Sequence, residues 1–249
     1  LYAPSLAKYD RVIVFSDLQA EVLARLGVRE ERLAVIPNGV DPDCWRPADT
    51  TLSTIGSPLR SGRARIGDKR MFLDMGRGAT EKNVEALLRA WRLVKPEGCH
   101  LVIVGDGPLH ATLQNTYSSN DVLWWGYEAD LATRVALLQS AEVFVLPSLV
   151  EGLSLALLEA MASGCACVAT DAGADGEVLA GGAGIVLSTQ GVTTQLRTLL
   201  PVLRDQPVLT RELGRQARER VLERYTMQSN IDALERLYAD VMRHEPMAA

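Results

Sequence analysis

Two carboxylates stand in an apolar stretch of the sequence, EGLSLALLEAMASGCAC. Glu151 opens the stretch, and Glu159 follows with seven residues between them. An unpaired carboxylate in an apolar core is unfavourable, so such a group either shifts its pKa or acquires hydrogen-bond donors. Sugar and ribose hydroxyls are donors of the kind that carboxylates accept. The stretch therefore predicts a site for a hydroxyl-rich ligand. The alternative is structural: a Glu151 favoured by a helix dipole and a Glu159 paired with an arginine.

The same stretch also predicts an anion site. The preceding run VFVLPS is typical of a strand, and a helix is expected to begin near Leu153 or Ser154 and to end at Gly164. The free N–H groups at a helix start attract anions such as phosphate. One short segment thus combines a phosphate cradle with two carboxylates.

A second group of polar residues lies in DMGRGATEKN, just after the strand-like run MFLDMG. Arg77 and Lys82 are the two cations of this segment, and Gly76 and Gly78 permit a tight backbone. Two cations in the first strand–helix loop suit a diphosphate, whereas exposed surface charge is the alternative. A third segment, VGDGP, is most simply a structural turn before a helix.

The elements that must position these residues alternate along the chain. Eight short apolar runs are typical of strands: RVIVFS, LAVIP, MFLDMG, HLVIVGD, VLWWG, VFVLPS, CACVAT and AGIVL. Amphipathic segments such as NVEALLRAWRLV and DLATRVALLQSA separate most of them. This alternation predicts an α/β fold, a Rossmann-like parallel sheet with helices on both faces. Ligands of such sheets bind beyond the carboxyl ends of the strands. Residues 46–70 are polar and locally basic, which predicts a loop.

Composition excludes several other classes of protein. The chain has 249 residues, is 47% hydrophobic and carries a formal net charge of −5, which argues against nucleic acid as the main partner. No uncharged apolar run reaches the ~18–20 residues that span a bilayer. The spacing of the four cysteines matches neither a redox motif nor a zinc site, so we expect reduced thiols in a cytoplasmic protein. The three histidines show no metal or triad spacing, and no metal site is predicted.

Five motifs in this order resemble those of a known family: VIPNGVD, GRGATEKN, VGDGP, EGLSLALLEAMASGCACVAT and GADGE. They resemble the C-terminal, donor-binding half of retaining glycosyltransferases of family four type, also called glycosyl transferases group 1. Those enzymes have two facing Rossmann-like domains, the GT-B architecture. The resemblance implies a metal-independent enzyme that transfers a sugar, with retention, from a nucleotide-diphosphate sugar to a hydroxyl acceptor. It implies a UDP- or GDP-linked donor substrate and no further cofactor.

The resemblance also implies roles for individual residues. Arg77 and Lys82, in the loop that begins at Gly76, would hold the diphosphate and support catalysis. Glu151, the other implied catalytic residue, would reach hydroxyls of the transferred sugar. The remaining implied contacts are the backbone around Gly152, Leu153, Ser154 and Leu155 for the phosphate, Glu159 for the ribose, and the loop at Gly126 and Tyr127 for the nucleobase.

The resemblance predicts three segments. Residues 1–32 resemble the last strand and helix of the acceptor domain, residues 33–226 the donor-binding domain, and residues 227–249 a helix that packs back toward the acceptor domain. We therefore expect this chain to depend on a missing or separate acceptor domain and to be inactive in transfer by itself. A nucleotide-binding module and, less consistent with the motifs, a non-hydrolysing epimerase are the alternatives. We also expect self-association through residues 1–30 or through the last helix. The parent protein is further expected to associate peripherally with a membrane.

Overall fold

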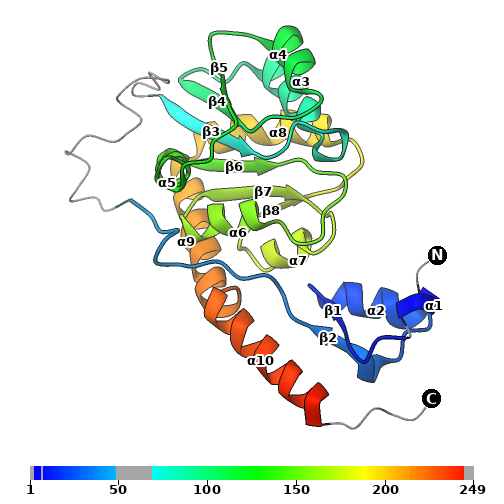
Figure 1. Cartoon of the computed structure of the whole chain (residues 1–249). Helices are drawn as coiled ribbons and strands as arrows, with labels where there is room; N and C mark the ends of the chain where they lie inside the picture. The colour runs from blue at the N-terminus through cyan, green and yellow to red at the C-terminus, as the bar shows by residue number, and fades with distance from the viewer. Residues whose placement is uncertain (1–2, 7, 49–68, 244–249) are drawn as a thin grey trace.

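A computed structural model of the chain describes residues 3–6, 8–48 and 69–243. Most of the loop expected at residues 46–70 lies outside the described residues, as do residues 1–2, 7 and 244–249. The expected α/β class is confirmed, because a parallel sheet is covered by helices on both faces (Figure 1).

The main sheet has six strands in the order β5-β4-β3-β6-β7-β8, and every neighbouring pair is parallel. The strands are β3 (Arg70–Met75), β4 (Cys99–Val104), β5 (Val122–Gly126), β6 (Val143–Leu146), β7 (Ala166–Thr170) and β8 (Ile185–Leu187). The chain runs outward from β3 to β5, then returns to place β6 on the other side of β3. Such a reversal of strand order opens a crevice at the carboxyl ends of the strands.

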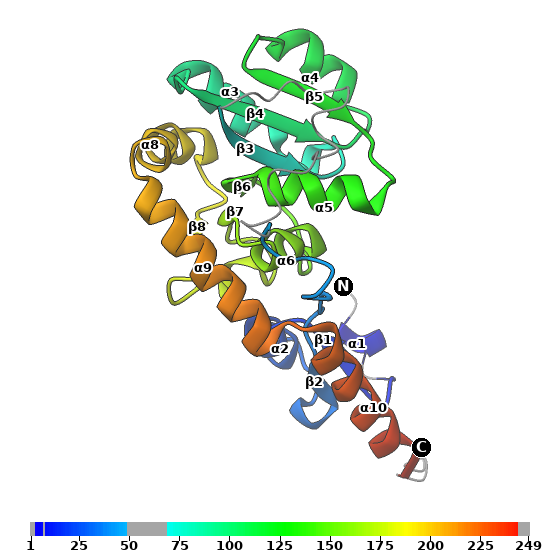
Figure 2. The same cartoon turned by 90° about the vertical axis from the view of Figure 1, so that its left-hand side faces the viewer.

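Two apolar clusters cover the two faces of the sheet. One lies under α3 (Val84–Val94), α4 (His110–Tyr117) and α8 (Val192–Asp205). The other lies under α5 (Leu131–Ser140), α6 (Leu155–Ala162), α7 (Asp175–Leu179) and the C-terminal part of α9 (Pro207–Arg224). Figure 2 shows α8 and α5 on opposite sides of the sheet.

Side-chain alternation along each strand explains why the two clusters form. In β3, Leu73 and Met75 belong to one cluster, whereas Phe72 belongs to the other and packs edge-on against Trp91 of α3, with ring centroids 5.3 Å apart. Successive strand residues point to opposite faces, so an uninterrupted apolar run supplies both cores.

The four cysteines are free thiols; three are buried, and Cys44 is half-buried.

The two remaining strand-like runs form a separate, two-stranded parallel sheet. In this sheet β1 (Val12–Val14) pairs with β2 (Leu33–Val35). Between the two strands the chain forms α2 (Asp17–Arg25) and the short helix η1 (Glu30–Arg32), and α1 (Ala3–Leu6) comes before β1. Residues 36–48 lead from this small unit to the main sheet. The last helix, α10 (Met227–Arg243), runs alongside the same unit in both views (Figures 1 and 2), and Asn230 Nδ2 donates to the Pro37 carbonyl at 2.6 Å.

Candidate functional site

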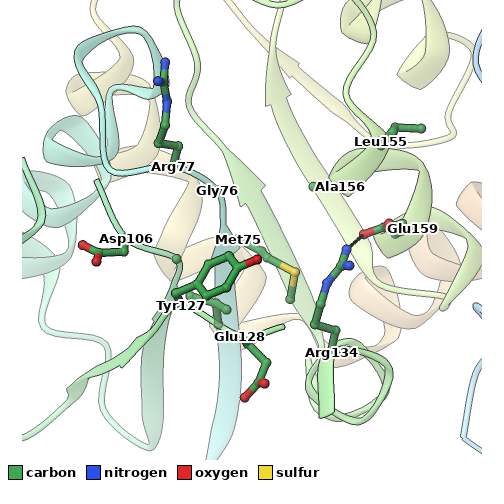
Figure 3. Close-up of a pocket in the computed structure, with 12 residues that line it drawn as sticks. Met75, Gly76, Arg77, Asp106, Tyr127, Glu128, Arg134, Leu155, Ala156 and Glu159 are labelled. Atoms are coloured by element: carbon green, nitrogen blue, oxygen red, sulfur yellow. Dashed lines mark hydrogen bonds and ion pairs between the residues drawn. The ribbon is translucent and has the colours of Figure 1, made fainter. Parts of the chain in front are cut away.

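A pocket of about 570 Å³ opens at the carboxyl ends of β3, β4 and β5, facing α5 and α6 (Figure 3). This is the crevice that the strand order predicts. Five residues named from the sequence line it: Gly76, Arg77, Tyr127, Leu155 and Glu159. The structure therefore brings residues from three separate segments of the chain to one cavity.

Close contact between two glycine-containing loops shapes one wall of this pocket. The Gly76 N–H donates to the carbonyl of Val104 at 2.9 Å, and the Gly78 N–H donates to that of Asp106 at 3.0 Å. Gly105 has a φ of +127°, and a Cβ atom there would overlap the carbonyl oxygen of Gly76. Glycine is required at this position both for its backbone conformation and for the space.

The side chain of Arg77 lies at the pocket rim. It is 65% exposed and forms an ion pair with Glu81, four residues later in the chain. Figure 3 shows its guanidinium group pointing away from the centre of the pocket. In this arrangement the cation borders the cavity and remains accessible to solvent and to a ligand.

Lys82 is more deeply placed. It ends the short helix η3 (Thr80–Lys82), and its Nζ atom lies 2.5 Å from Oε1 of Glu151, with the two side chains 23% and 9% exposed. Two further contacts tie the same segments together: Leu149 N–H donates to the Glu81 carbonyl at 2.7 Å, and Asn83 Nδ2 donates to the Pro147 carbonyl at 3.1 Å. The cation and the carboxylate that sequence analysis named separately are therefore partners.

The start of α6 is capped by protein groups. Ser154 is the N-cap, and its Oγ accepts from the Leu157 N–H at 3.3 Å. Its own N–H donates to Oδ1 of Asp175 at 2.9 Å, so the carboxylate of the first residue of α7 already accepts from this N–H. The pKa of Asp175 is raised to about 7, chiefly by burial; the Ser154 N–H opposes the rise, Glu151 adds to it, and Lys82 opposes it. Asp175 was not among the site residues predicted from the sequence, although its position as an acidic residue inside the GADGE motif was a visible signal.

The backbone before α6 is held from the N-terminal side of the chain. Asn38 Nδ2 donates to the Leu153 carbonyl at 3.0 Å, and Gln19 Nε2 donates to the Gly152 carbonyl at 3.2 Å. Lys82, Glu151, Gly152, Leu153 and Ser154 do not line the 570 Å³ pocket but lie beside it, where Leu155 begins the helix. The predicted site residues thus fall into two adjoining groups.

Glu159 faces the pocket from the second turn of α6, and its partner is Arg134 of α5. Arg134 Nη2 lies 2.7 Å from Oε2 of Glu159, and the side chains are 31% and 12% exposed. Burial raises the pKa of Glu159, and the arginine lowers it. The arginine partner that sequence analysis left open as an alternative is present, and the carboxylate still lines the cavity.

Three charged residues of the pocket were not predicted: Asp106, Glu128 and Arg134. Asp106 lies in the segment interpreted as a turn, and its Oδ1 does accept from the Gly107 N–H at 2.7 Å. Glu128 is fixed by the indole N–H of Trp125, 3.0 Å from Oε2. Their position after a strand was the available signal, whereas nothing local distinguished Arg134 within its helix.

Two kinds of feature are absent from the part of the chain that the structure describes. Within them, no group of three or more His, Cys, Asp or Glu side chains is arranged to hold a metal ion. None of the described helices combines the length and apolarity needed to cross a bilayer.

Comparison with known proteins agrees with this geometry. A family model described as Glycosyl transferases group 1 matches residues 69–205, and one described as Glycosyltransferase Family 4 matches residues 1–44. The chain is 30% identical over 226 residues to the putative glycosyltransferase EpsF of Bacillus subtilis, covering 85% of this chain and 54% of that protein. It is 31% identical over 218 residues to an MMP alpha-(1->4)-mannosyltransferase of Mycolicibacterium hassiacum, covering 87% and 50%. The chain spans about half the length of these curated relatives.

Solved structures show the same fold. A sucrose-phosphate synthase from Thermosynechococcus elongatus superposes with a TM-score of 0.79 at 24% identity, covering 96% of this chain and 60% of that one. Anabaena HepE, solved in complex with UDP-glucose, superposes with a TM-score of 0.77 at 20% identity, covering 96% and 68%. With the family match over residues 69–205, the resemblance seen in the motifs is confirmed, and the chain belongs to the group 1 glycosyl transferases.

Proposed function

We propose that this chain binds a nucleotide-diphosphate sugar and is the donor-binding half of a retaining hexosyltransferase. The observation that carries the proposal is the pocket of about 570 Å³ at the strand-order reversal, where Arg77 and Glu159 line one cavity. A cation suits the phosphates of a nucleotide, and a carboxylate suits its ribose hydroxyls. The UDP-glucose complex of the structurally similar HepE supports a UDP-linked donor, and a GDP-linked donor is the other candidate.

In this proposal the donor lies across both groups of site residues. Tyr127, exposed at the mouth of the pocket, contacts the nucleobase, and Glu159 accepts from the ribose hydroxyls. Arg77 and Lys82 bind the diphosphate, so Lys82 exchanges Glu151 for phosphate oxygens. Glu151, released from this pair, accepts hydrogen bonds from the transferred sugar.

The transfer step follows from the same arrangement. The bond between the anomeric carbon and the diphosphate oxygen breaks, and the diphosphate leaves with the electron pair. The acceptor oxygen bonds to the anomeric carbon on the same face, and its proton passes to an oxygen of the leaving diphosphate. Arg77 and Lys82 stabilise the charge on the leaving group, which is the work that a metal ion does in other transferases.

Titration calorimetry with UDP, GDP and ADP tests donor binding directly. We expect one of them to bind equally well with Mg²⁺ or EDTA, and Arg77→Ala and Glu159→Gln to weaken that binding about tenfold, as for a lost charged hydrogen bond. Arg215→Ala is the control, because Arg215 pairs with Glu212 and Glu219 on α9, away from the pocket. If none of the three diphosphates binds, the proposed function is wrong.

A binding module without transferase activity is the second candidate for the chain taken alone, because it spans about half the length of its curated relatives. Transfer requires donor and acceptor in near-attack geometry, and this positioning can lower the barrier by ~7–11 kcal/mol. We therefore expect the 249-residue chain to bind the donor without glycosylating an acceptor, and slow donor hydrolysis is the most activity we expect. Rapid sugar transfer by the purified chain would contradict this expectation.

A further inference from the structure

Arg134 is held on two sides at the edge of the pocket. It lies on α5, one turn after the N-cap Asp130, and its guanidinium points toward Glu159 of α6 (Figure 3). On its other side, its guanidinium carbon lies 5.2 Å from the ring centre of Trp45. Stacking on an aromatic ring and pairing with a carboxylate both restrict the orientation of a guanidinium.

Trp45 is itself well anchored. It belongs to the apolar core between the sheet and α6, and its carbonyl accepts from Arg218 Nη1 of α9 at 3.1 Å. The same stretch is fixed to α5 by Gln139 Nε2, which donates to the Arg46 carbonyl at 3.0 Å. Trp45 therefore offers Arg134 a rigid surface, and Arg134 transmits that rigidity to Glu159.

The ion pair with Arg134 engages only one oxygen of the Glu159 carboxylate. Arg134 Nη2 binds Oε2 at 2.7 Å, whereas within the described residues no hydrogen bond reaches Oε1. The side chain is largely buried, and burial favours the protonated acid, which would be a poorer acceptor for hydroxyl groups. The pKa of Glu159 is raised on balance, and Arg134 opposes part of the rise through its charge and its hydrogen bond.

We infer that Arg134 is a positioning residue for donor binding: it holds the Glu159 carboxylate ionised and oriented, with Oε1 open to the ribose hydroxyls of a nucleoside diphosphate. The inference rests on the proposed function, since it concerns how the same pocket distinguishes a ribose from a 2′,3′-dideoxyribose. It assigns a role to a residue that none of the five sequence motifs contains.

Hydroxyl discrimination tests the inference. Calorimetry compares UDP, GDP and ADP with their 2′,3′-dideoxy forms for the unsubstituted protein, Arg134→Gln, Arg134→Lys and the control Arg215→Gln. For the diphosphate that binds, we expect loss of both hydroxyls to weaken binding by about tenfold or more in the unsubstituted protein and the control. The quantity to compare is the ratio between the Kd of the dideoxy form and the Kd of the parent diphosphate. In Arg134→Gln this ratio falls below about threefold, because Glu159 no longer has its cation.

The Lys variant separates charge from orientation. A lysine ammonium can restore the charge but neither the planar, delocalised guanidinium beside Trp45 nor its fixed donor geometry, so we expect an intermediate ratio. A ratio in Arg134→Gln equal to that of the unsubstituted protein overturns the inference while leaving donor binding intact. If the Gln variant does not fold, the Lys variant carries the test, and an unchanged ratio there overturns the inference. Failure of all three diphosphates to bind the unsubstituted protein overturns the proposed function instead, and the inference with it.

Discussion

The ion pair between Lys82 and Glu151 can be broken by a single substitution, Lys82→Met, which keeps the length of the side chain. Removing one partner of a buried pair costs ~3–5 kcal/mol, because the other charge stays buried without compensation. Glu151 is 9% exposed but Lys82 is 23% exposed, so we expect the lower end of this range, about 3 kcal/mol. For a chain of this size that corresponds to a fall in melting temperature of about 6–12 °C.

Two measurements separate the structural role of the pair from its role in binding. Thermal unfolding without ligand gives the stability, and calorimetry with UDP and GDP gives the affinity. The double variant Lys82→Met/Glu151→Gln removes the uncompensated charge, so we expect it to recover most of the lost melting temperature while donor binding stays weak. Lys95→Met, at an exposed helix C-cap, is the matched control and should change neither quantity.

Two results would refute this reasoning. A melting temperature unchanged in Lys82→Met would show that Glu151 does not depend on the lysine for its charge. A double variant as unstable as the single one would show that the cost arises from lost packing of the lysine stem rather than from an unpaired carboxylate. Full donor affinity in Lys82→Met would separately exclude Lys82 from diphosphate binding.

Three further predictions follow from buried or exposed features of the fold. Burial raises the pKa of Asp74 to about 7, so between about pH 4 and 7 the folded chain holds a proton that the unfolded chain releases, and the melting temperature should fall as the pH rises through this range. Asp74→Asn should flatten that decline, and an equal slope in the variant would contradict the prediction. Gly105→Ala should destabilise the fold and weaken UDP or GDP binding more than Gly98→Ala does, because Gly98 shares a positive φ but has open space where a Cβ atom would lie. Equal melting temperatures for the two variants would contradict this prediction. Leu18 and Val22 expose apolar side chains on α2, so we expect the chain to self-associate as its concentration rises and Val22→Glu to reduce this association. Monomeric sedimentation of the unsubstituted chain at high concentration would contradict this prediction.

Local patterns were sufficient for the fold class and for part of the site. Short apolar runs alternating with amphipathic segments have few physical solutions other than a covered parallel sheet. Since the carboxyl ends of parallel strands share one edge, polar residues just after strands, such as Arg77 and Tyr127, converge there without any knowledge of the strand order. Gly76 and Gly105 were visible for the same reason, because their loops join that edge.

Tertiary structure alone decided which groups became partners. Arg134 and Glu159 are 25 residues apart, and Ser154 and Asp175 are 21 apart. No local pattern states that a side chain of α5 reaches α6 or that the first residue of α7 reaches the start of α6. It also decided that β1 and β2 pair with each other rather than extend the main sheet. A strand-like run specifies backbone conformation and apolar faces through short-range sterics, whereas the choice of neighbour depends on the packing of the whole chain. For that reason the sequence by itself determined the elements and the edge where the site lies, and the folded chain determined which charges meet there.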